Sequence, residues 1–296
     1  MARKKADPCP PAPMPIDERD AAMEWLAYVD DVRTGKRPPP MPTGLRQLDE
    51  IIYGMIPGLV VVIAGRPGMG KSALVKQLCR NCVSLDPSYA ALLTVLEMSP
   101  EQNAARTLSG ETRIGFGSMV RGKVTEADMT RLWAAQNNIK GGQFFLDQRQ
   151  RSVTHYREHI REFKAHLATR GKVLKVVGLD YCQQMATFDG SREQNIAAIS
   201  NMAKTIAVEE QVCFLLLSQL NRGLENRDDK RPIMADLRES GAIEQDADQV
   251  IMVYRPAVYS HSAPEENAEL ILRKNRWGEL GTAEVHWNGR GVRFEE

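Results

Sequence analysis

The sequence predicts an α/β protein with a mostly parallel, twisted sheet and helices on both of its faces. Two observations support this fold class. From Thr43 onward, short and nearly continuous apolar runs alternate with helical patterns, as buried parallel strands and their covering helices do. One apolar run, at 59–64, leads directly into a glycine-rich turn at 65–72. A buried strand that ends in such a turn and opens a helix is typical of a nucleotide-binding site.

The N-terminal segment is expected to divide into two parts. Residues 1–15 are rich in proline and charge and are predicted to form a disordered tail. Residues 16–42 are predicted to form an amphipathic helix, at 17–33, followed by a proline-rich tether. The helix carries one apolar stripe at helical spacing, made of Ala22, Trp25, Leu26, Val29 and Val32. This stripe must be buried either on the chain's own core or on a neighbouring subunit.

The remaining residues, 43–296, are expected to form one core domain. Its predicted helices lie at 70–83, 125–138, 152–169 and 191–209, and its predicted strands at 90–96, 144–146, 173–180, 212–218 and 249–254. A further helix begins after Ser99, where Pro100 takes the first position and Gln102 completes a capping box. The segments 268–273 and 282–287 predict a C-terminal β-hairpin.

The glycine-rich turn is a complete phosphate-binding loop (P-loop, or Walker A motif). It fits the pattern G-x-x-x-x-G-K-S and reads Gly65, Arg66, Pro67, Gly68, Met69, Gly70, Lys71 and Ser72. Its glycines let the backbone wrap a polyphosphate, and the following helix offers its unpaired N–H groups. We expect Lys71 to reach the β- and γ-phosphates of ATP and the Ser72 hydroxyl to hold Mg²⁺.

Three polar residues at the ends of predicted strands are candidates for the remaining chemistry. Asp180 ends the strand at 173–180, where a carboxylate can help to hold Mg²⁺. Glu97 follows the strand at 90–96, on the same edge of the sheet as the P-loop, and can act as base toward an attacking water. Gln219 follows the strand at 212–218 and can hydrogen-bond the γ-phosphate. The alternatives are an ordinary strand-ending acid, a solvated loop residue and a polar turn, respectively.

A long polar segment, 236–248, is interpreted as an irregular loop between two strands. Long loops in compact domains are usually functional. With the basic residues that precede it, this segment can contact phosphates through arginine side chains and backbone N–H groups. No zinc-finger or RNA-recognition pattern accompanies it, so sequence-specific readout is not indicated. A solvated surface loop is the alternative.

Charge and cysteine content narrow the class of protein further. The net charge of +1 excludes a strongly basic protein, although a balanced total can contain a local basic channel. The five cysteines fit no disulfide framework, and Cys79 and Cys82 are interpreted as small helix-packing residues rather than as a metal pair. No apolar run approaches the length of a membrane span, and no apolar segment follows the basic N-terminus. We therefore expect a cytoplasmic protein.

Taken together, these motifs resemble the C-terminal ATPase domain of the DnaB family of replicative hexameric helicases, which has a RecA-like fold. The resemblance covers about 43–294. The P-loop is shared by many ATPases, whereas the run from Arg238 to Asp248 is far more specific to this family. The other matching pieces are Thr43-Gly44, Leu48-Asp49, Leu96-Glu97-Met98, Asp180-Tyr181, Gln183, Met185, Leu217 to Arg222, Lys230-Arg231-Pro232 and Lys274-Asn275-Arg276.

The resemblance implies roles at the ATP site that spacing alone leaves open. Glu97 would be the catalytic glutamate, Asp180 the metal-side acid and Gln219 the γ-phosphate sensor. Lys274 and Arg276 would reach into the ATP site of the next subunit of a ring. An arginine supplied in this way raises the rate by about 10³–10⁵ in GTPases, so we expect a poor ATPase until the protein assembles.

The resemblance also implies how DNA and neighbours are bound. Arg238, Glu239 and Gly241 would grip the phosphates of one DNA strand, the last two through backbone N–H groups. The helix at 17–33 would be the family's linker helix, which docks on a neighbouring subunit. The family's N-terminal primase-binding domain has no counterpart in the 42 residues before the core, so we expect no primase contact through that domain.

The expected activity is that of an ATP- and Mg²⁺-dependent DNA helicase. It would assemble as a homo-hexamer, translocate 5′ to 3′ on single-stranded DNA and unwind duplex, with a helicase loader as a possible partner. Two alternatives stay open. One is a RecA- or RadA-like DNA-dependent ATPase that does not unwind, and the other is a regulatory subunit of a host helicase ring.

Overall fold

The structure, a computed structural model, describes residues 15–139, 141–149, 151–180, 191–260 and 262–296, with the backbone alone at 192 and 238–240. It divides into two compact units, Met1–Pro39 and Pro40–Glu296. The predicted disordered tail lies almost entirely outside the described residues. The strands and helices predicted for the second unit are found in the predicted order, with further elements between them.

The first unit contains α1 (Glu18–Arg33), the predicted amphipathic helix. Asp17 caps it by accepting hydrogen bonds from the N–H groups of Arg19 and Asp20. Every side chain of α1 is described, and none is buried. On its apolar stripe, Trp25 is 56% exposed and Leu26 is 66% exposed. Which surface covers this stripe stays a prediction.

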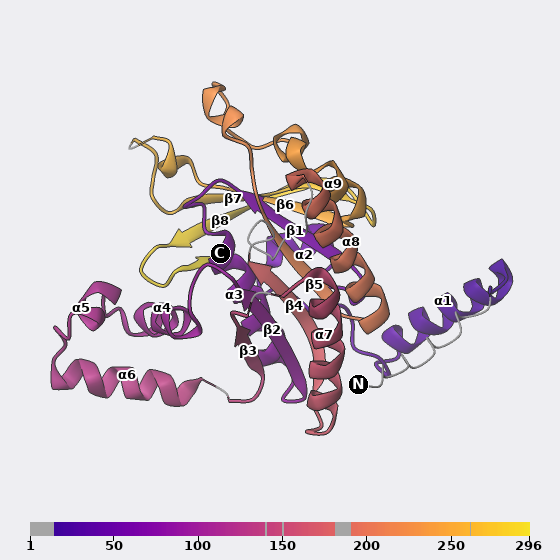
Figure 1. Cartoon of the computed structure of the whole chain (residues 1–296), viewed down its shortest axis with the longest axis horizontal. Helices are drawn as coiled ribbons and strands as arrows, with labels where there is room; N and C mark the ends of the chain where they lie inside the picture. The colour runs from indigo at the N-terminus through magenta and orange to yellow at the C-terminus, as the bar shows by residue number, and fades with distance from the viewer. Residues whose placement is uncertain (1–14, 140, 150, 181–190, 261) are drawn as a thin grey trace, which may run out of the picture. The chain divides into compact units, whose positions relative to one another are not determined.

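The second unit is built on a single described sheet of nine strands in the order β3-β2-β4-β5-β1-β6-β7-β8-β9 (Figure 1). The strands from β3 to β6 in this order are parallel, and β7, β8 and β9 continue it as an antiparallel edge. The predicted fold class and hairpin are confirmed, and β9 is an additional strand. The nine strands are β1 (Val60–Gly65), β2 (Tyr89–Val95), β3 (Phe144–Asp147), β4 (Val173–Asp180), β5 (Cys213–Gln219), β6 (Gln249–Tyr254), β7 (Asn267–Asn275), β8 (Gly281–Asn288) and β9 (Arg293–Glu295).

Hydrophobic cores fill both faces of the sheet because the apolar strands alternate their side chains between them. Val60, Val62 and Ala64 of β1 belong to one core, and Val61 and Ile63 belong to the other. The first core is covered by α7 (Val153–Ala168), α8 (Arg192–Glu210) and α9 (Gly241–Asp246), and the second by α2 (Arg46–Ile52) and α3 (Lys71–Leu85). The three described cysteines are free and buried in the second core, as helix- and strand-packing residues.

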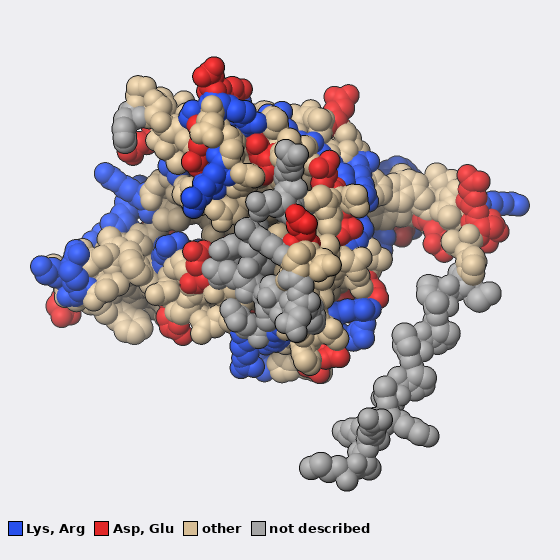
Figure 2. All heavy atoms as spheres, turned by 45° about the horizontal axis from the view of Figure 1, so that its top comes forward, with Lys and Arg blue, Asp and Glu red and all other residues tan. Residues whose placement is uncertain are grey.

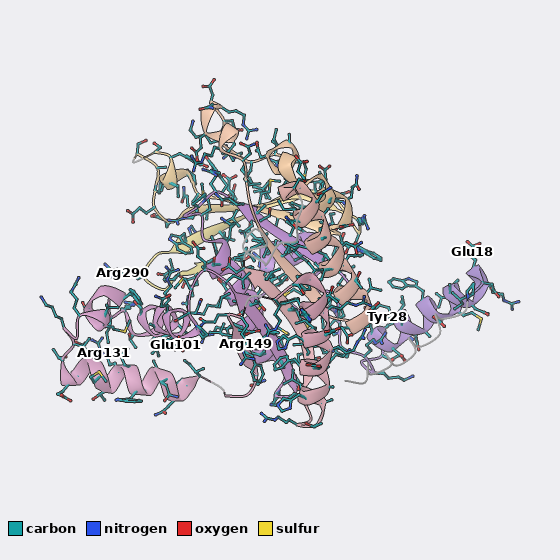
Figure 3. All side chains as sticks on the ribbon, in the orientation of Figure 1. Glu18, Tyr28, Glu101, Arg131, Arg149 and Arg290 are labelled. Atoms are coloured by element: carbon teal, nitrogen blue, oxygen red, sulfur yellow. The ribbon has the colours of Figure 1, made fainter. Side chains whose placement is uncertain are left out.

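Helix α3 lies very close to the sheet at β4. A Cβ added to Gly178 would stand 2.7 Å from Leu93 Cδ1 and 3.0 Å from Val75 Cγ1 of α3. Glycine at this position therefore permits the close approach of the helix that follows the P-loop. Three further helices extend from the end of β2, namely α4 (Pro100–Thr112), α5 (Phe116–Val120) and α6 (Glu126–Asn138) (Figure 1). Arg131 of α6, labelled in Figure 3, connects α6 to α4 by donating to the carbonyl of Thr112 at the end of α4.

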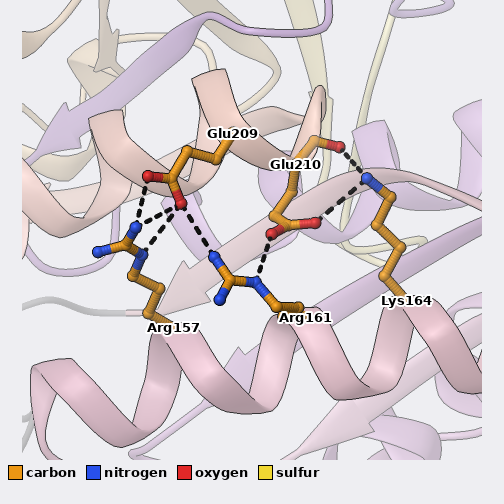
Figure 4. Close-up of polar contacts among 5 residues, drawn as sticks. All are labelled: Arg157, Arg161, Lys164, Glu209 and Glu210. Atoms are coloured by element: carbon orange, nitrogen blue, oxygen red, sulfur yellow. Dashed lines mark hydrogen bonds and ion pairs between the residues drawn. The ribbon is translucent and has the colours of Figure 1, made fainter. Parts of the chain in front are cut away.

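A ladder of charged side chains joins α7 to α8 (Figure 4). Arg157 and Arg161 both pair with Glu209, and Arg161 and Lys164 both pair with Glu210. Lys164 also donates to the backbone carbonyl of Glu210, at 2.8 Å. Most of these side chains are half-exposed, so the ladder aligns the helices more than it stabilises them.

The prediction that 236–248 is an irregular loop is wrong. The segment between β5 and β6 contains two 3₁₀ helices, η2 (Arg222–Asn226) and η3 (Met234–Ser240), followed by α9. Ile243 and Ala247 are buried in the core under α8, which is why the chain becomes helical there. The sequence also did not predict α2 or α5.

Surface charge is balanced, and no described helix is long and apolar enough to cross a membrane. Figure 2 shows Lys and Arg side chains intermixed with Asp and Glu over the face that it presents. This face of the molecule therefore carries no continuous basic surface among the described residues.

Candidate nucleotide-binding site

The P-loop connects β1 to α3 and depends on two glycines with left-handed backbones. Gly68 has φ +80° and Gly70 has φ +96°, a region that side chains rarely adopt. A Cβ on Gly70 would also stand 2.9 Å from Phe294 Cζ and 3.0 Å from Trp287 Cζ3. The last strands of the sheet thus press against the P-loop, and only glycine leaves space for both rings.

Lys71 is held inside the loop that it is predicted to serve. Its Nζ donates to the backbone carbonyl of Arg66, at 3.0 Å. Burial lowers the pKa of Lys71 to about 8, a shift that the nearby carboxylate of Asp180 partly opposes. A partly buried ammonium group with one neutral acceptor is poised to bind an anion, because phosphate oxygens would replace that carbonyl and favour the charged form.

The predicted site residues meet because β2, β4, β5 and β1 are parallel neighbours, so that their carboxyl ends lie side by side. Asp180 is paired with Val95, two residues before Glu97, and Gln219 is paired with Gly65. One cavity of about 340 Å³ lies over these strand ends, and its lining includes Lys71, Ser72, Glu97, Asp180 and Gln219. Sequence reasoning placed these five residues together, and the structure confirms that placement. Their chemical roles stay predictions.

Ser72 and Asp180 offer the oxygen atoms that Mg²⁺ prefers. Burial raises the pKa of the Asp180 carboxyl, while a hydrogen bond with the Ser72 side chain and the charge of Lys71 act in the opposite direction. Glu97, in contrast, is exposed at the rim of the cavity. The two acids thus lie in different environments, one enclosed beside the P-loop hydroxyl and one open to water.

A second cavity continues from the first along α3. It has a volume of about 310 Å³ and lies between α3, α4 and the turn at 291–293. The two cavities share Ser72, Ala73, Arg106 and Val292. The guanidinium of Arg106, on α4, makes no hydrogen bond or ion pair with any residue that the structure describes. It is therefore a cation available to a ligand that extends from one cavity into the other.

The P-loop is tied to the chain segment that follows β5. The Arg66 guanidinium is only 9% exposed and donates through Nη1 to the carbonyl of Leu220, at 2.9 Å. Its Nε donates to Glu225 Oε1 of η2, at 2.7 Å. These bonds therefore connect the P-loop directly to the chain segment between β5 and β6.

Lys274 and Arg276 lie near the amino ends of the parallel strands, whereas their own P-loop lies at the carboxyl end of β1. Asn275 pairs with Gln249, which pairs with Val61 near the start of β1. At a rise of about 3.3 Å per residue, the length of β1 alone separates them from the P-loop by about 16 Å. The two side chains therefore do not join the cavity that holds Lys71, and in this respect they differ from the other predicted site residues.

The predicted DNA-binding residues occupy η3 and the start of α9. Arg238 and Glu239 lie in η3, and their side chains are outside the described residues. Gly241 is the first residue of α9 and is exposed. The matching pieces Tyr181, Gln183 and Met185 are also outside the described residues.

Residues 40–296 match the family model described as the DnaB-like helicase C-terminal domain. The chain belongs to this family. It is 35% identical over 285 residues to the replicative DNA helicase DnaB of Leifsonia xyli subsp. xyli, which covers 95% of this chain and 59% of that protein. It is 34% identical over 250 residues to the replicative DNA helicase DnaC of Bacillus subtilis, which covers 83% of this chain and 54% of that protein. The chain thus spans somewhat more than half the length of these relatives.

Solved structures of the family share the fold. The ATPase domain of G40P is 29% identical, with a TM-score of 0.83 over 94% of this chain and 99% of that one. A DnaB-like replicative helicase, described with its interactions with primase, is 30% identical, with a TM-score of 0.81 over 92% of this chain and 66% of that one. The expected RecA-like core of the DnaB family is therefore confirmed.

Sequence reasoning missed several residues at this DnaB-like site. Arg255 donates to the carbonyl of Gly68, at 3.1 Å, and its guanidinium lies 4.4 Å from the centre of the Trp287 ring. Trp287 also lines the cavity over the P-loop, as does Arg106. A basic residue on the helix after Glu97 was a usable signal for Arg106. No local sequence signal pointed to Arg255 or Trp287. They reach the P-loop through the pairing of β6, β7 and β8, which joins segments that are distant in the sequence.

Proposed function

We propose that this chain is the ATP-hydrolysing motor of a replicative DNA helicase. It would form a homo-hexameric ring that translocates 5′ to 3′ on single-stranded DNA. One observation carries the proposal beyond family membership. The cavity collects a P-loop lysine, two acids and a glutamine, while Lys274 and Arg276 lie at the other edge of the sheet. In a head-to-tail ring, that edge of one subunit faces the open cavity of the next.

The cavity supports the following roles for the residues that line it. Lys71 would leave the Arg66 carbonyl and bind the β- and γ-phosphates, and the exposed Glu97 carboxylate would take the proton of the attacking water. Gln219 would contact the γ-phosphate at the end of β5 and transmit its loss to the segment that follows. Ser72 and Asp180 would hold Mg²⁺, which supplies charge neutralisation between the phosphates. The ribose and base would extend past Arg106 into the second cavity.

DNA would be bound by the segment between β5 and β6 without sequence readout. Arg238 would bind backbone phosphates through its side chain, and Glu239 and Gly241 would do so through N–H groups. Binding of single strands should then weaken with salt, with a slope of about −0.7 per phosphate neutralised in a plot of log affinity against log salt concentration. A helicase loader would bind the assembled ring.

Strand displacement on forked duplexes of both polarities tests the proposal. The unaltered protein should displace a strand only from the fork that offers a 5′ single-stranded tail, and Lys71→Ala should abolish both turnover and displacement. Arg238→Ala should weaken single-strand binding and spare ATP binding. Arg46→Ala, an exposed arginine on α2, serves as the matched control and should change neither.

Two outcomes would replace the proposal. DNA-stimulated turnover without displacement on either fork would indicate a RecA- or RadA-like ATPase. Turnover that is absent in the purified protein and appears only with a host helicase ring would indicate a regulatory subunit. If Arg238→Ala bound and unwound DNA normally, the assignment of the DNA segment would be wrong.

A further inference from the structure

Asp248 is a buried carboxylate on which three elements converge. Its side chain is 3% exposed, and the residue lies between the end of α9 at Asp246 and the start of β6. One oxygen accepts from the N–H of Val60 at the start of β1, at 2.8 Å. Lys204 of α8 donates to both oxygens, at 2.7 and 2.9 Å, and Arg276 Nη1 donates to one of them, at 3.2 Å.

The same arginine is also bound to the end of α9. Arg276 Nη2 donates to the carbonyl of Gln245, at 2.6 Å, and its backbone N–H donates to the carbonyl of Asp248, at 3.0 Å. Lys274 donates to the carbonyls of Glu244 and Gln245. The last carbonyls of a helix lack partners within it and carry partial negative charge, so they attract cations. The two cations thus rest on the helix that begins at Gly241.

We propose that Asp248 is a positioning residue that holds the Arg276 guanidinium against the C-terminal end of α9. This inference rests on the proposed function, in which Arg276 acts in the ATP site of the next subunit. Because Gly241 at the other end of α9 is proposed to contact DNA, this short helix would connect the DNA contact of one subunit with the arginine that acts in the ATP site of the next.

Lys204 fixes the Asp248 carboxylate from its inner side. Because Asp248 also holds the ammonium of Lys204 and the N–H of Val60, the carboxylate keeps its place and its charge is paired while it holds Arg276. The Arg276 side chain is 47% exposed, compared with 29% for Lys204, so the arginine is the partner that can present its remaining N–H groups to a phosphate of the next subunit.

A double-mutant cycle of Asp248→Asn with Arg276→Ala, read by DNA-stimulated turnover, tests the proposal. Asp248→Asn should lower kcat by about 10²-fold, the scale of a misplaced catalytic group. It should leave the KM for ATP unchanged, because the arginine is proposed to act on the charge that develops in the transition state. In the Arg276→Ala background the same substitution should have no further effect on kcat. Glu158→Gln, at an exposed carboxylate of α7 remote from these contacts, is the matched control and should behave as the unaltered protein.

Mixed rings add a readout that a structural role would not move. Subunits with Lys71→Ala keep an intact Arg276, and subunits with Asp248→Asn keep an intact P-loop. A mixture should therefore turn over faster than the mean of the two separate preparations. If Asp248→Asn does not fold, Lys204→Met replaces it in the same double-mutant cycle. Lys204→Met keeps the Asp248 carboxylate and changes only how firmly that carboxylate holds Arg276.

An effect of Asp248→Asn, or of Lys204→Met, that is equally large in the Arg276→Ala background would overturn the positioning role. Failure of the mixed rings to exceed the mean would do the same. If Arg276→Ala itself left turnover unchanged, the proposed trans-acting arginine would be wrong, and with it the function on which the inference rests.

Discussion

Replacing Arg66 by methionine should loosen the connection between the P-loop and the segment after β5. The guanidinium makes two hydrogen bonds, to the carbonyl of Leu220 and to the carboxylate of Glu225. Methionine keeps much of the aliphatic volume of arginine, so the change mainly removes these bonds. The Leu220 carbonyl is then left without its charged donor.

The expected loss can be worked out bond by bond. A hydrogen bond from a charged donor to a carbonyl contributes about 1.5–3 kcal/mol. The Glu225 side chain is 42% exposed, so its ion pair adds about 0–1 kcal/mol. We expect Arg66→Met to lower the free energy of unfolding by about 1.5–4 kcal/mol, and thus the unfolding temperature by about 3–16 °C for a core of this size.

Thermal unfolding followed by calorimetry measures this loss, and Glu225→Gln is the matched control. The control removes only the exposed half of the connection and should cost less than about 1 kcal/mol. DNA stimulation of turnover should fall in Arg66→Met more than in the control. An unfolding temperature equal to that of the unaltered protein, or an equal loss in both variants, would refute the reasoning.

Three further predictions follow from the described residues. Because burial lowers the pKa of Lys71 to about 8 and a bound polyphosphate raises it again, ATP binding above pH 8 should take up a proton and weaken by up to about tenfold per pH unit; calorimetry in buffers of different protonation enthalpy shows whether the proton is absorbed. Phe214→Ala, at a fully buried position of β5, should lower the free energy of unfolding by about 3–5 kcal/mol in urea titrations, and a loss below 1 kcal/mol would argue against the packed core. Arg157→Ala, in the half-exposed ladder of Figure 4, should cost no more than about 1 kcal/mol in the same titration, and a larger loss would show that the ladder stabilises the fold.

Much of the fold could be predicted because its signals are local. The strand at 173–180 was predicted at the bounds of β4, and the capping box of Ser99 and Gln102 begins α4 as expected. The site followed from the same signals, since Glu97, Asp180 and Gln219 each come at the end of a strand. In a parallel sheet, those ends meet at one edge.

The rest depends on contacts between distant segments. Helix α9 has six residues, too few for a periodic pattern, and it is helical because Ile243 packs under α8. Trp287 reaches the P-loop through the pairing of antiparallel strands, and the bonds of Asp248 to Val60 and Lys204 join residues 188 and 44 positions apart. No local pattern encodes these partners.

The central claim is that ATP is hydrolysed at a site shared by two subunits. Turnover per chain, measured across protein concentration together with native mass in the presence of ATP and a short oligonucleotide, tests it most directly. The account predicts weak turnover in single chains and a rise of about 10³-fold or more over the concentration range in which rings form. Single chains that hydrolyse ATP at the rate of the assembled protein would contradict it.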